Sequence, residues 1–171
     1  MLSKKIEKEL NEQINKEMYS AYLYMSMSSY STNNGLPGFA NWFMVQYKEE
    51  MEHAMKIYDY VHSQSGKVKL MAITEPLSDF KDPMDMFQRT LKHEQFVTKC
   101  INELVDLSIK EKDHATQIFL QWFVTEQIEE EGNDNDIISK LELAGLKGNG
   151  LFMIDKELST RVYNPPLKEK N

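Results

Sequence analysis

Apolar side chains recur every three or four residues along four long stretches of this chain, with polar side chains between them. This spacing places the apolar residues on one face of a helix and is typical of helices that pack together. The predicted long helices cover about Ser3–Thr32, Pro37–Ser65, Pro83–Lys112 and His114–Ala144. A short fifth helix is expected over residues 149–158, where Leu151, Ile154 and Leu158 share one side.

Glycine and proline occur mainly between these stretches and mark the ends of the helices. Gly35 suits a C-terminal cap, and Pro37 suits the first turn of the next helix. Asp82 can cap the third helix ahead of Pro83, and Gly145 closes the fourth. Most connections are therefore expected to be short.

One connection is long: after Gly66 comes "KVKLMAITEPLSDFKD", which has no helical period. A link of about 17 residues can span up to about 56 Å, whereas a helix of about 28 residues is about 42 Å long. The link can therefore return along the whole bundle, which makes the second and third helices parallel. The sequence predicts an all-α four-helix bundle with one long crossover, forming one domain over residues 1–161 with a disordered tail over 162–171.

Charge and composition exclude some classes of binding partner and cellular location. The formal net charge of −7 argues against nucleic acid or an anionic membrane, because both attract lysine and arginine, and it favours cations as ligands. Cys100 is the only cysteine, and the N-terminal "MLSKKIEKEL" lacks the apolar run of a signal peptide. No apolar stretch approaches the roughly 20 residues of a membrane span. We therefore expect a soluble protein of the reducing cytoplasm.

The predicted inner face of every long helix carries an acid near its middle. In helix order the inner faces read Leu10, Ile14, Glu17, Ala21 and Tyr24; Phe39, Phe43, Gln46, Glu50, His53 and Ile57; Phe87, Leu91, Glu94, Thr98, Ile101 and Val105; and Leu120, Phe123, Gln127, Glu130, Asp134 and Ile137. No lysine or arginine lies on these faces. A single acid in such a position is more often partly exposed or protonated than functional.

Four such acids together indicate a bound metal. An unpaired buried carboxylate costs several kcal/mol, so the sum would rival a domain's whole stability of roughly 5 to 15 kcal/mol. Glu50 and His53, three residues apart, can grip one ion from the same side. Oxygen-rich ligation with one imidazole favours iron or manganese over structural zinc, and this number of acids favours two adjacent ions over one.

Five segments identify a family resemblance: "NEQINKEMYSAYLY", "EEMEHAMKIYDY", "KHEQFVTKCINEL", "FLQWFVTEQIEEE" and "GLFMIDKELST". Together they make the chain as far as Arg161 similar to the bacterial non-haem ferritins. Ferritin-like carboxylate proteins commonly carry Glu-x-x-His on two helices. Here the fourth helix departs from that pattern, because Gln127 and Glu130 replace its glutamate and histidine.

The resemblance implies a ferritin-like fold and a set of iron ligands. An iron-oxidation centre for two irons would consist of Glu17, Glu50, His53, Glu94 and Gln127, with Glu50 bridging the two ions. A third iron site nearby, toward the cavity, would consist of Glu49, Glu126, Glu129 and Glu130. Tyr24 matches the family's tyrosine beside the centre, where it could donate an electron or a hydrogen bond; a packed core tyrosine is the alternative.

The resemblance also implies the activity and the assembly. Iron(II) would be oxidised by oxygen or hydrogen peroxide, a ferroxidase reaction, and stored as mineral inside a homo-oligomeric shell of twenty-four subunits. Neither nucleic acid nor a membrane is expected as a partner. Met51 stands where bacterioferritins place a haem ligand. No haem is expected, however, because the fourth helix lacks the Glu-x-x-His that bacterioferritins carry.

Two other classes are compatible with parts of this pattern. A cage that stores mineral without oxidising iron would be expected to lack the paired-site ligands, which this chain retains. A di-iron oxidase of the rubrerythrin type would be expected to carry Cys-x-x-Cys, which one cysteine cannot supply.

Several residues outside the predicted ligand set also carry expectations. Cys100 is expected to be a small buried residue and Trp122 a core or interface residue, whereas surface positions are expected for His62, His93 and His114. The poor helix formers at 132–136 cost about 2 to 4 kcal/mol relative to alanine. They predict either a bend at Gly132 or a relay in which Asp134 accepts iron from Glu130.

Overall fold

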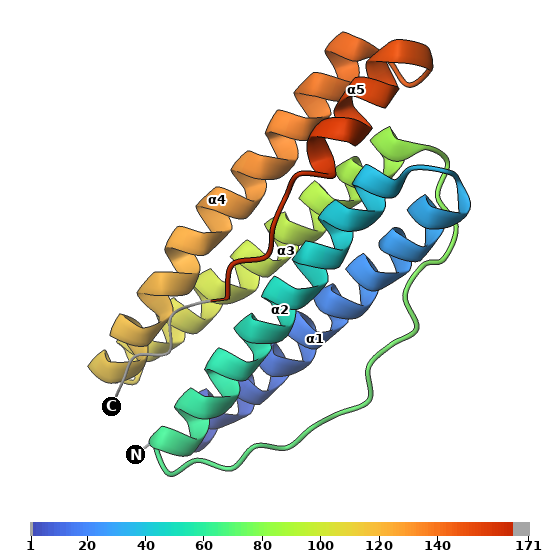
Figure 1. The fold of residues 1–171 in the computed structure, drawn as a ribbon. Coiled ribbons are helices and arrows are strands. Elements are labelled where there is room, and N and C mark those ends of the chain that lie inside the picture. Colours follow the sequence, from blue (N-terminus) through green and yellow to red (C-terminus); the bar gives the residue numbers. More distant parts are fainter. Residues whose placement is uncertain (1, 166–171) are drawn as a thin grey trace.

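A computed structural model describes residues 2–165 of the chain. In this range all the regular structure is helical, as Figure 1 shows. The elements are α1 Lys4–Asn33, α2 Pro37–Ser63, α3 Pro83–Lys110, α4 His114–Ala144 and α5 Gly148–Leu158. The predicted all-α class, the four long helices and the short fifth helix are confirmed, and the helix ends agree to within about two residues.

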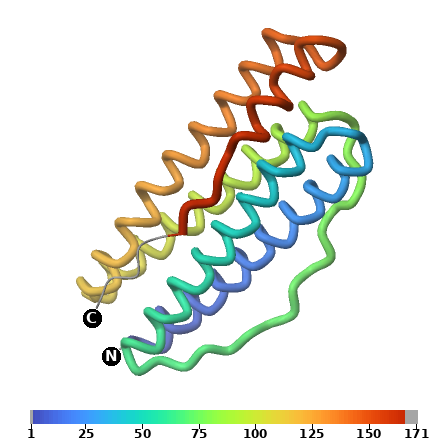
Figure 2. The backbone as a smooth tube through the Cα atoms, viewed as in Figure 1, coloured from blue at the N-terminus to red at the C-terminus, as the bar shows by residue number. Residues whose placement is uncertain are grey.

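The four long helices lie side by side, and the link from α2 to α3 runs the length of the bundle along its outside (Figures 1 and 2). This path makes α2 and α3 parallel, while the short turns make α1 and α2, and α3 and α4, antiparallel. The link is tied to α1: the Asn11 side chain donates to the Lys67 carbonyl at 3.0 Å, and Ser26 donates to the Leu77 carbonyl at 2.7 Å. The predicted crossover topology is therefore confirmed.

The helix ends form where the sequence places capping residues. Asp82 accepts a hydrogen bond from the Asp85 amide at 2.9 Å and caps α3, whose first residue is a proline. Gly35 and Gly145 follow α1 and α4 with φ of 71° and 78°, in the left-handed region that glycine occupies without strain. These caps fix where each long helix starts and stops.

A polar layer divides the apolar core into two clusters. One cluster, near α5, includes Tyr24, Phe39, Phe43, Phe87 and Ile137. The other, toward the opposite end, includes Ile14, Ile57, Val97, Ile101 and Phe123. The buried acids of the four helices lie between them in sequence, so the apolar packing on either side holds the polar layer in place.

The buried face of α3 differs from its predicted one. Thr90, Val97 and Leu104 are buried, whereas the residues that follow each of them, Leu91, Thr98 and Val105, are only half-buried. Successive residues are 100° apart around the helix axis. A rotated helix therefore buries a neighbouring set of residues with the same three- and four-residue spacing. The rotation leaves Thr98 at the edge of the helix that faces α4.

Candidate metal centre

Three side chains from two helices form the first part of the polar layer. Ligand atoms of Glu17 on α1 and of Glu50 and His53 on α2 all lie within 4.8 Å of one another, and all three residues are buried. His53 Nδ1 is 3.4 Å from Glu50 Oε2, because residues three apart share a helix face. Gln13, one turn before Glu17, donates to its carboxylate at 2.8 Å and orients it.

Glu94 of α3 provides the facing carboxylate. The Tyr24 hydroxyl donates to Glu94 Oε1, and Gln127 Nε2 on α4 donates to Glu94 Oε2 at 3.1 Å. Tyr24 is fully buried and its ring stacks on Phe43, so its position is set by the apolar cluster. Both oxygens of Glu94 are therefore held by donors from other helices.

A second group of ligand atoms adjoins the first through His53. His53, Glu126 and Glu130 offer ligand atoms within 4.8 Å of one another, and His53 Nε2 is 3.9 Å from Glu126 Oε1. Gln46 of α2 donates to Glu130 Oε2 at 2.8 Å across the bundle. The two nitrogens of one imidazole thus face two different carboxylate groups.

The four acids expected at a third site are not equally placed. Glu130 is buried and Glu126 is half-buried, whereas Glu129 is exposed. Glu49 is half-buried and is bound by Arg161, whose Nη2 lies 2.6 Å from Glu49 Oε2. Only Glu126 and Glu130 belong to the compact group around His53.

Burial without positive charge dominates the electrostatics of this layer. No lysine or arginine is among the buried side chains of residues 2–165. Burial, reinforced by neighbouring carboxylates, raises the pKa of Glu50 well above its ordinary value; burial likewise raises the pKa of Glu94 and of Glu130. A bound cation would reverse these shifts, because it favours the ionised carboxylates.

The donor set fits a divalent cation such as iron(II). Carboxylate oxygens with one imidazole match the ligand preferences of iron and manganese. Ligand atoms that share one first-row ion lie within about 4.2 Å of each other, and the atoms of each group lie within 4.8 Å of one another, so each group can close on one ion with at most small side-chain shifts. The arrangement can therefore hold a cation in the first group and another in the adjoining one.

Two contributors to this region carried little sequence signal. Gln13 lies outside the predicted inner face, and Gln46 lies on it without an assigned role, yet each binds a carboxylate of the centre. The buried Oε1 of each glutamine has no hydrogen-bond partner among the described residues. In the sequence, the contact between Gln13 and Glu17 is indicated only by their spacing of four residues, which places them on one helix face.

Arg161 reaches Glu49 because the chain turns back after α5. Residues 159–165 leave α5 and run along the bundle beside α2 and α4 (Figure 1). Asn41 donates to the carbonyls of Leu158 and Arg161 at 3.2 and 2.9 Å, and the Arg161 guanidinium lies 4.6 Å from the Trp42 ring. The tail predicted over 162–171 lies outside the described residues from 166 onward.

Cys100 and two of the three histidines outside the centre lie where the sequence predicts. Cys100 is buried and His62 and His114 are exposed, as predicted. The surface position predicted for His93 is wrong: it is half-buried, its Nε2 lies 2.8 Å from Ser20 Oγ, and its ring packs against Tyr19. Burial lowers the pKa of His93 to about 4. The rotated face of α3 turns this residue toward α1.

Trp122 lies at the edge of the centre. It is 38% exposed and its ring stands edge-on to His53, with centroids 5.3 Å apart. Trp122 is therefore only partly buried, and it packs against one side of the His53 imidazole.

The segment around Gly132 belongs to a continuous helix. α4 runs without a break through residues 132–136 although these are poor helix formers. Asp134 is 1% exposed, and its Oδ2 has no hydrogen-bond partner among the described residues. Burial, with Glu94 and Glu130 nearby, raises the pKa of Asp134 to about 9. A relay through Asp134 stays a proposal and would require iron to enter the bundle interior.

None of the helices over residues 2–165 combines the length and the apolar character that a membrane crossing requires.

The chain matches a known protein family and several curated proteins along most of its length. A family model described as "Ferritin-like domain" matches residues 7–144. The chain is 46% identical over 156 residues to a bacterial non-heme ferritin of Campylobacter jejuni, covering 91% of this chain and 93% of that protein. It is 40% identical over 160 residues to a bacterial non-heme ferritin of Escherichia coli O157:H7, covering 94% and 97%.

Solved structures give the same result at the level of the fold. An open pore ferritin from the archaeon Archaeoglobus fulgidus superposes with a TM-score of 0.94 at 50% sequence identity, covering 95% of this chain and 100% of that one. A humanized archaeal ferritin gives a TM-score of 0.95 at 48% identity, covering 96% and 100%. Both sequence and fold are thus similar along nearly the full length.

Proposed function

Because this chain belongs to the ferritin family, whose members store iron, we propose that it is a ferroxidase: it oxidises iron(II) at the buried carboxylate layer and stores the product. One observation carries this proposal. Five side chains from all four long helices, namely Glu17, Glu50, His53, Glu94 and Gln127, lie in the polar layer and are buried together without a lysine or arginine to neutralise them. Two bound iron(II) ions supply the missing charge.

The proposed reaction uses iron as the substrate. Two iron(II) ions each give one electron to an oxidant held between them. Oxygen with two protons becomes hydrogen peroxide, and hydrogen peroxide with two protons becomes two waters; two iron(III) ions result in either case. The protein holds both metals within reach of one oxidant, which converts an encounter of three species into a local step.

Each ligand is assigned a proposed role. Glu17 and His53, which lie close to Glu50, hold one iron from the α1–α2 side, Glu94 holds the other from α3, and Glu50 bridges the two, as the family resemblance implies. Burial, reinforced by neighbouring carboxylates, raises the pKa of Glu50 and favours its protonated form in the metal-free protein, so binding of iron at Glu50 displaces a proton into solvent. Tyr24 donates to Glu94 and is placed to supply an electron or to hold that carboxylate.

Product iron moves on through the adjoining acids. Glu126 and Glu130 share His53 with the pair and, with Glu49 and Glu129, form the proposed third site. Iron(III) passing this site would reach the cavity and grow there as mineral.

The proposed assembly is a shell of twenty-four subunits in the cytoplasm, with no haem. Large apolar side chains on the subunit surface support an oligomer: Leu143 is 91% exposed and Phe152 on α5 is 65% exposed. Ile118 and Ile128 on α4 are exposed as well. Such residues are costly to leave in water when they gather in patches, and contacts between subunits would bury them.

Size-exclusion chromatography and an aerobic iron(II) oxidation assay test this function together. A large assembly with fast oxidation supports it, and a variant with both Glu50→Ala and His53→Ala should assemble but lose the fast phase. A small oligomer, or unchanged initial rates in that variant, would refute the assignment. Assembly and oxidation are thereby tested separately.

A further inference from the structure

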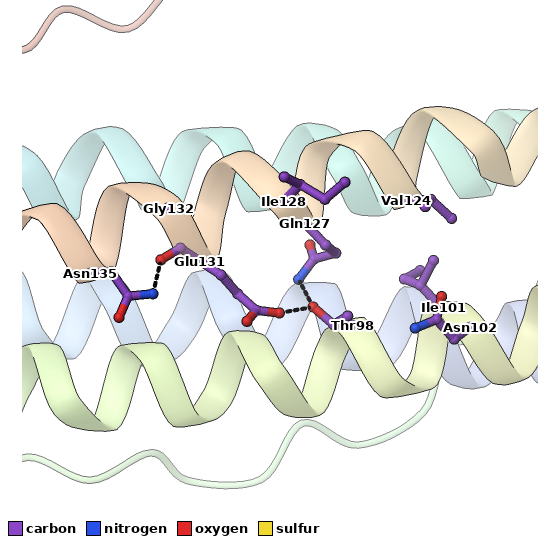
Figure 3. Close-up of a pocket in the computed structure, with 9 residues that line it drawn as sticks. All are labelled: Thr98, Ile101, Asn102, Val124, Gln127, Ile128, Glu131, Gly132 and Asn135. Carbon is purple, nitrogen blue, oxygen red and sulfur yellow. Dashed lines mark hydrogen bonds between the residues drawn. The ribbon is translucent and has the colours of Figure 1, made fainter.

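A half-buried threonine lies beside the proposed iron centre in a groove between α3 and α4. The groove has a volume of about 420 Å³, and Thr98, Gln127 and Glu131 are among the residues that line it. Figure 3 shows that these three side chains are joined by hydrogen bonds. Neither Thr98 nor Glu131 is among the proposed iron ligands.

The hydroxyl of Thr98 makes an uncommon choice of acceptor. A threonine inside a helix ordinarily donates to the carbonyl four residues earlier. Thr90 on the same helix donates to the Met86 carbonyl at 3.0 Å, and Thr125 on α4 donates to the Gln121 carbonyl at 3.2 Å. Thr98 instead donates across to Glu131 Oε1 at 2.6 Å.

The Glu94 carbonyl, four residues before Thr98, already accepts the helix hydrogen bond of the Thr98 backbone N–H, and this choice leaves its second lone pair for a donor from elsewhere. Gln127 Nε2 donates to that carbonyl at 3.2 Å and to the carboxylate oxygen Oε2 of the same Glu94 at 3.1 Å. It also lies 3.3 Å from Thr98 Oγ1, which can only accept there because its own proton goes to Glu131.

All of these contacted atoms accept hydrogen bonds, so the nitrogen of the Gln127 amide, which is the donor, faces them. The amide oxygen is turned to the other side, as Figure 3 shows. If the Thr98 hydroxyl turned back to its ordinary acceptor, it would compete with Gln127 for the Glu94 carbonyl. The orientation of Gln127, and through it the carboxylate of Glu94, therefore depends on Glu131.

We propose that Glu131 and Thr98 are positioning residues for the iron pair: Glu131 draws the Thr98 hydroxyl away from the Glu94 carbonyl, so that Gln127 holds Glu94 ready to bind. The inference rests on the proposed function and adds to it two residues that do not touch iron. Groups that orient metal ligands in this way typically change metal affinity by 10- to 100-fold when they are removed.

The geometry sets a distinctive order among variants. Glu131→Ala removes the acceptor, so the Thr98 hydroxyl returns to the Glu94 carbonyl and displaces Gln127. Thr98→Val keeps the shape of the side chain but removes that competitor. Adding Thr98→Val to Glu131→Ala should therefore restore much of what the first change removes, whereas two purely structural defects would add.

Anaerobic iron(II) titration by calorimetry measures the affinity of the pair. We expect Glu131→Ala to bind iron(II) about 10-fold more weakly than the unchanged protein, and the double variant to come within about 3-fold of it. Glu142→Ala, which removes an exposed carboxylate from the same helix, is the matched control and should leave the affinity unchanged. Unchanged binding in Glu131→Ala, or weaker binding in the double variant than in Glu131→Ala, would overturn the proposal.

A crystal structure of metal-free Glu131→Ala separates this inference from the proposed function. It should show Thr98 Oγ1 within hydrogen-bond distance of the Glu94 carbonyl and Gln127 Nε2 withdrawn from it. An unchanged Gln127 would refute the positioning role even if the protein oxidises iron. If Gln127 moves as expected in Glu131→Ala but the protein without substitutions does not bind iron(II), the proposed function has failed and the positioning role has not.

Discussion

Replacing Asp134 by asparagine should stabilise the metal-free protein. Asp134 is 1% exposed, and its Oδ2 has no hydrogen-bond partner among the described residues. Burial first, and then the neighbouring Glu94 and Glu130, raise its pKa from 3.8 to about 9. At neutral pH the side chain is therefore protonated in the folded protein and ionised in the unfolded one. Asparagine has nearly the same shape and no proton to take up.

The size and sign of the effect follow from linkage. Folding requires Asp134 to take up a proton, so its contribution to stability falls as pH rises above 3.8 and stops falling near 9. About 3 pH units separate pH 7 from 3.8, and each unit corresponds to about 1.36 kcal/mol, so the free energy of unfolding loses up to about 4 kcal/mol at pH 7. Asp134→Asn should recover this loss, and the recovery should grow by about 1.4 kcal/mol per pH unit between pH 5 and 8.

Guanidinium unfolding followed by tryptophan fluorescence at one protein concentration, with chelator present, measures the difference. Asp136→Asn is the matched control, because Asp136 is exposed two residues further along α4, and its unfolding curve should move little. A gain for Asp134→Asn that does not depend on pH, or no gain at all, would show that this carboxyl is not a buried acid of the kind described.

Three further variants test other parts of the account. Gly132→Ala should raise the free energy of unfolding by about 0.5 to 1 kcal/mol in thermal denaturation, because an added Cβ meets nothing within 4 Å; a loss of stability would mean that the helix needs glycine there. Arg161→Gln should increase iron(II) affinity outside the pair in anaerobic titrations, since it frees Glu49 from an ion pair with an N–O distance of 2.6 Å, and unchanged affinity would mean that Arg161 does not compete with iron. Glu130→Ala should leave fast oxidation intact while the iron bound per subunit falls; loss of binding at the pair would place Glu130 in it.

The fold could be predicted from the sequence because its determinants are local. Apolar period, glycine and proline positions and the length of the link set the helices and their directions. The predicted inner face of α3 was partly wrong: Thr90 is buried and the adjacent Leu91 is only half-buried, although helical period allows either residue on the inner face. The packing of α3 against α1 and α4 decides between them, and that information is not local. His93 was misplaced for the same reason.

The candidate site could be predicted to the extent that it depends on helix period. Glu17, Glu50 and His53 meet because each lies at mid-length on an inner face. The contact of Arg161 with Glu49 joins residues 112 positions apart and depends on the path of the chain after α5, which no period encodes. The choice of acceptor by Thr98 depends on a side-chain rotation relative to Glu131, which the sequence likewise does not reveal.

The central claim is that two irons are oxidised together in one subunit. Adding increasing amounts of iron(II) to the metal-free protein in aerated buffer, and recording the amplitude of the fast absorbance rise by stopped flow, measures this number directly. The amplitude should increase linearly and break at two iron(II) ions per subunit. A break at one ion per subunit, or a rise without a break, would contradict a paired centre built from Glu17, Glu50, His53, Glu94 and Gln127.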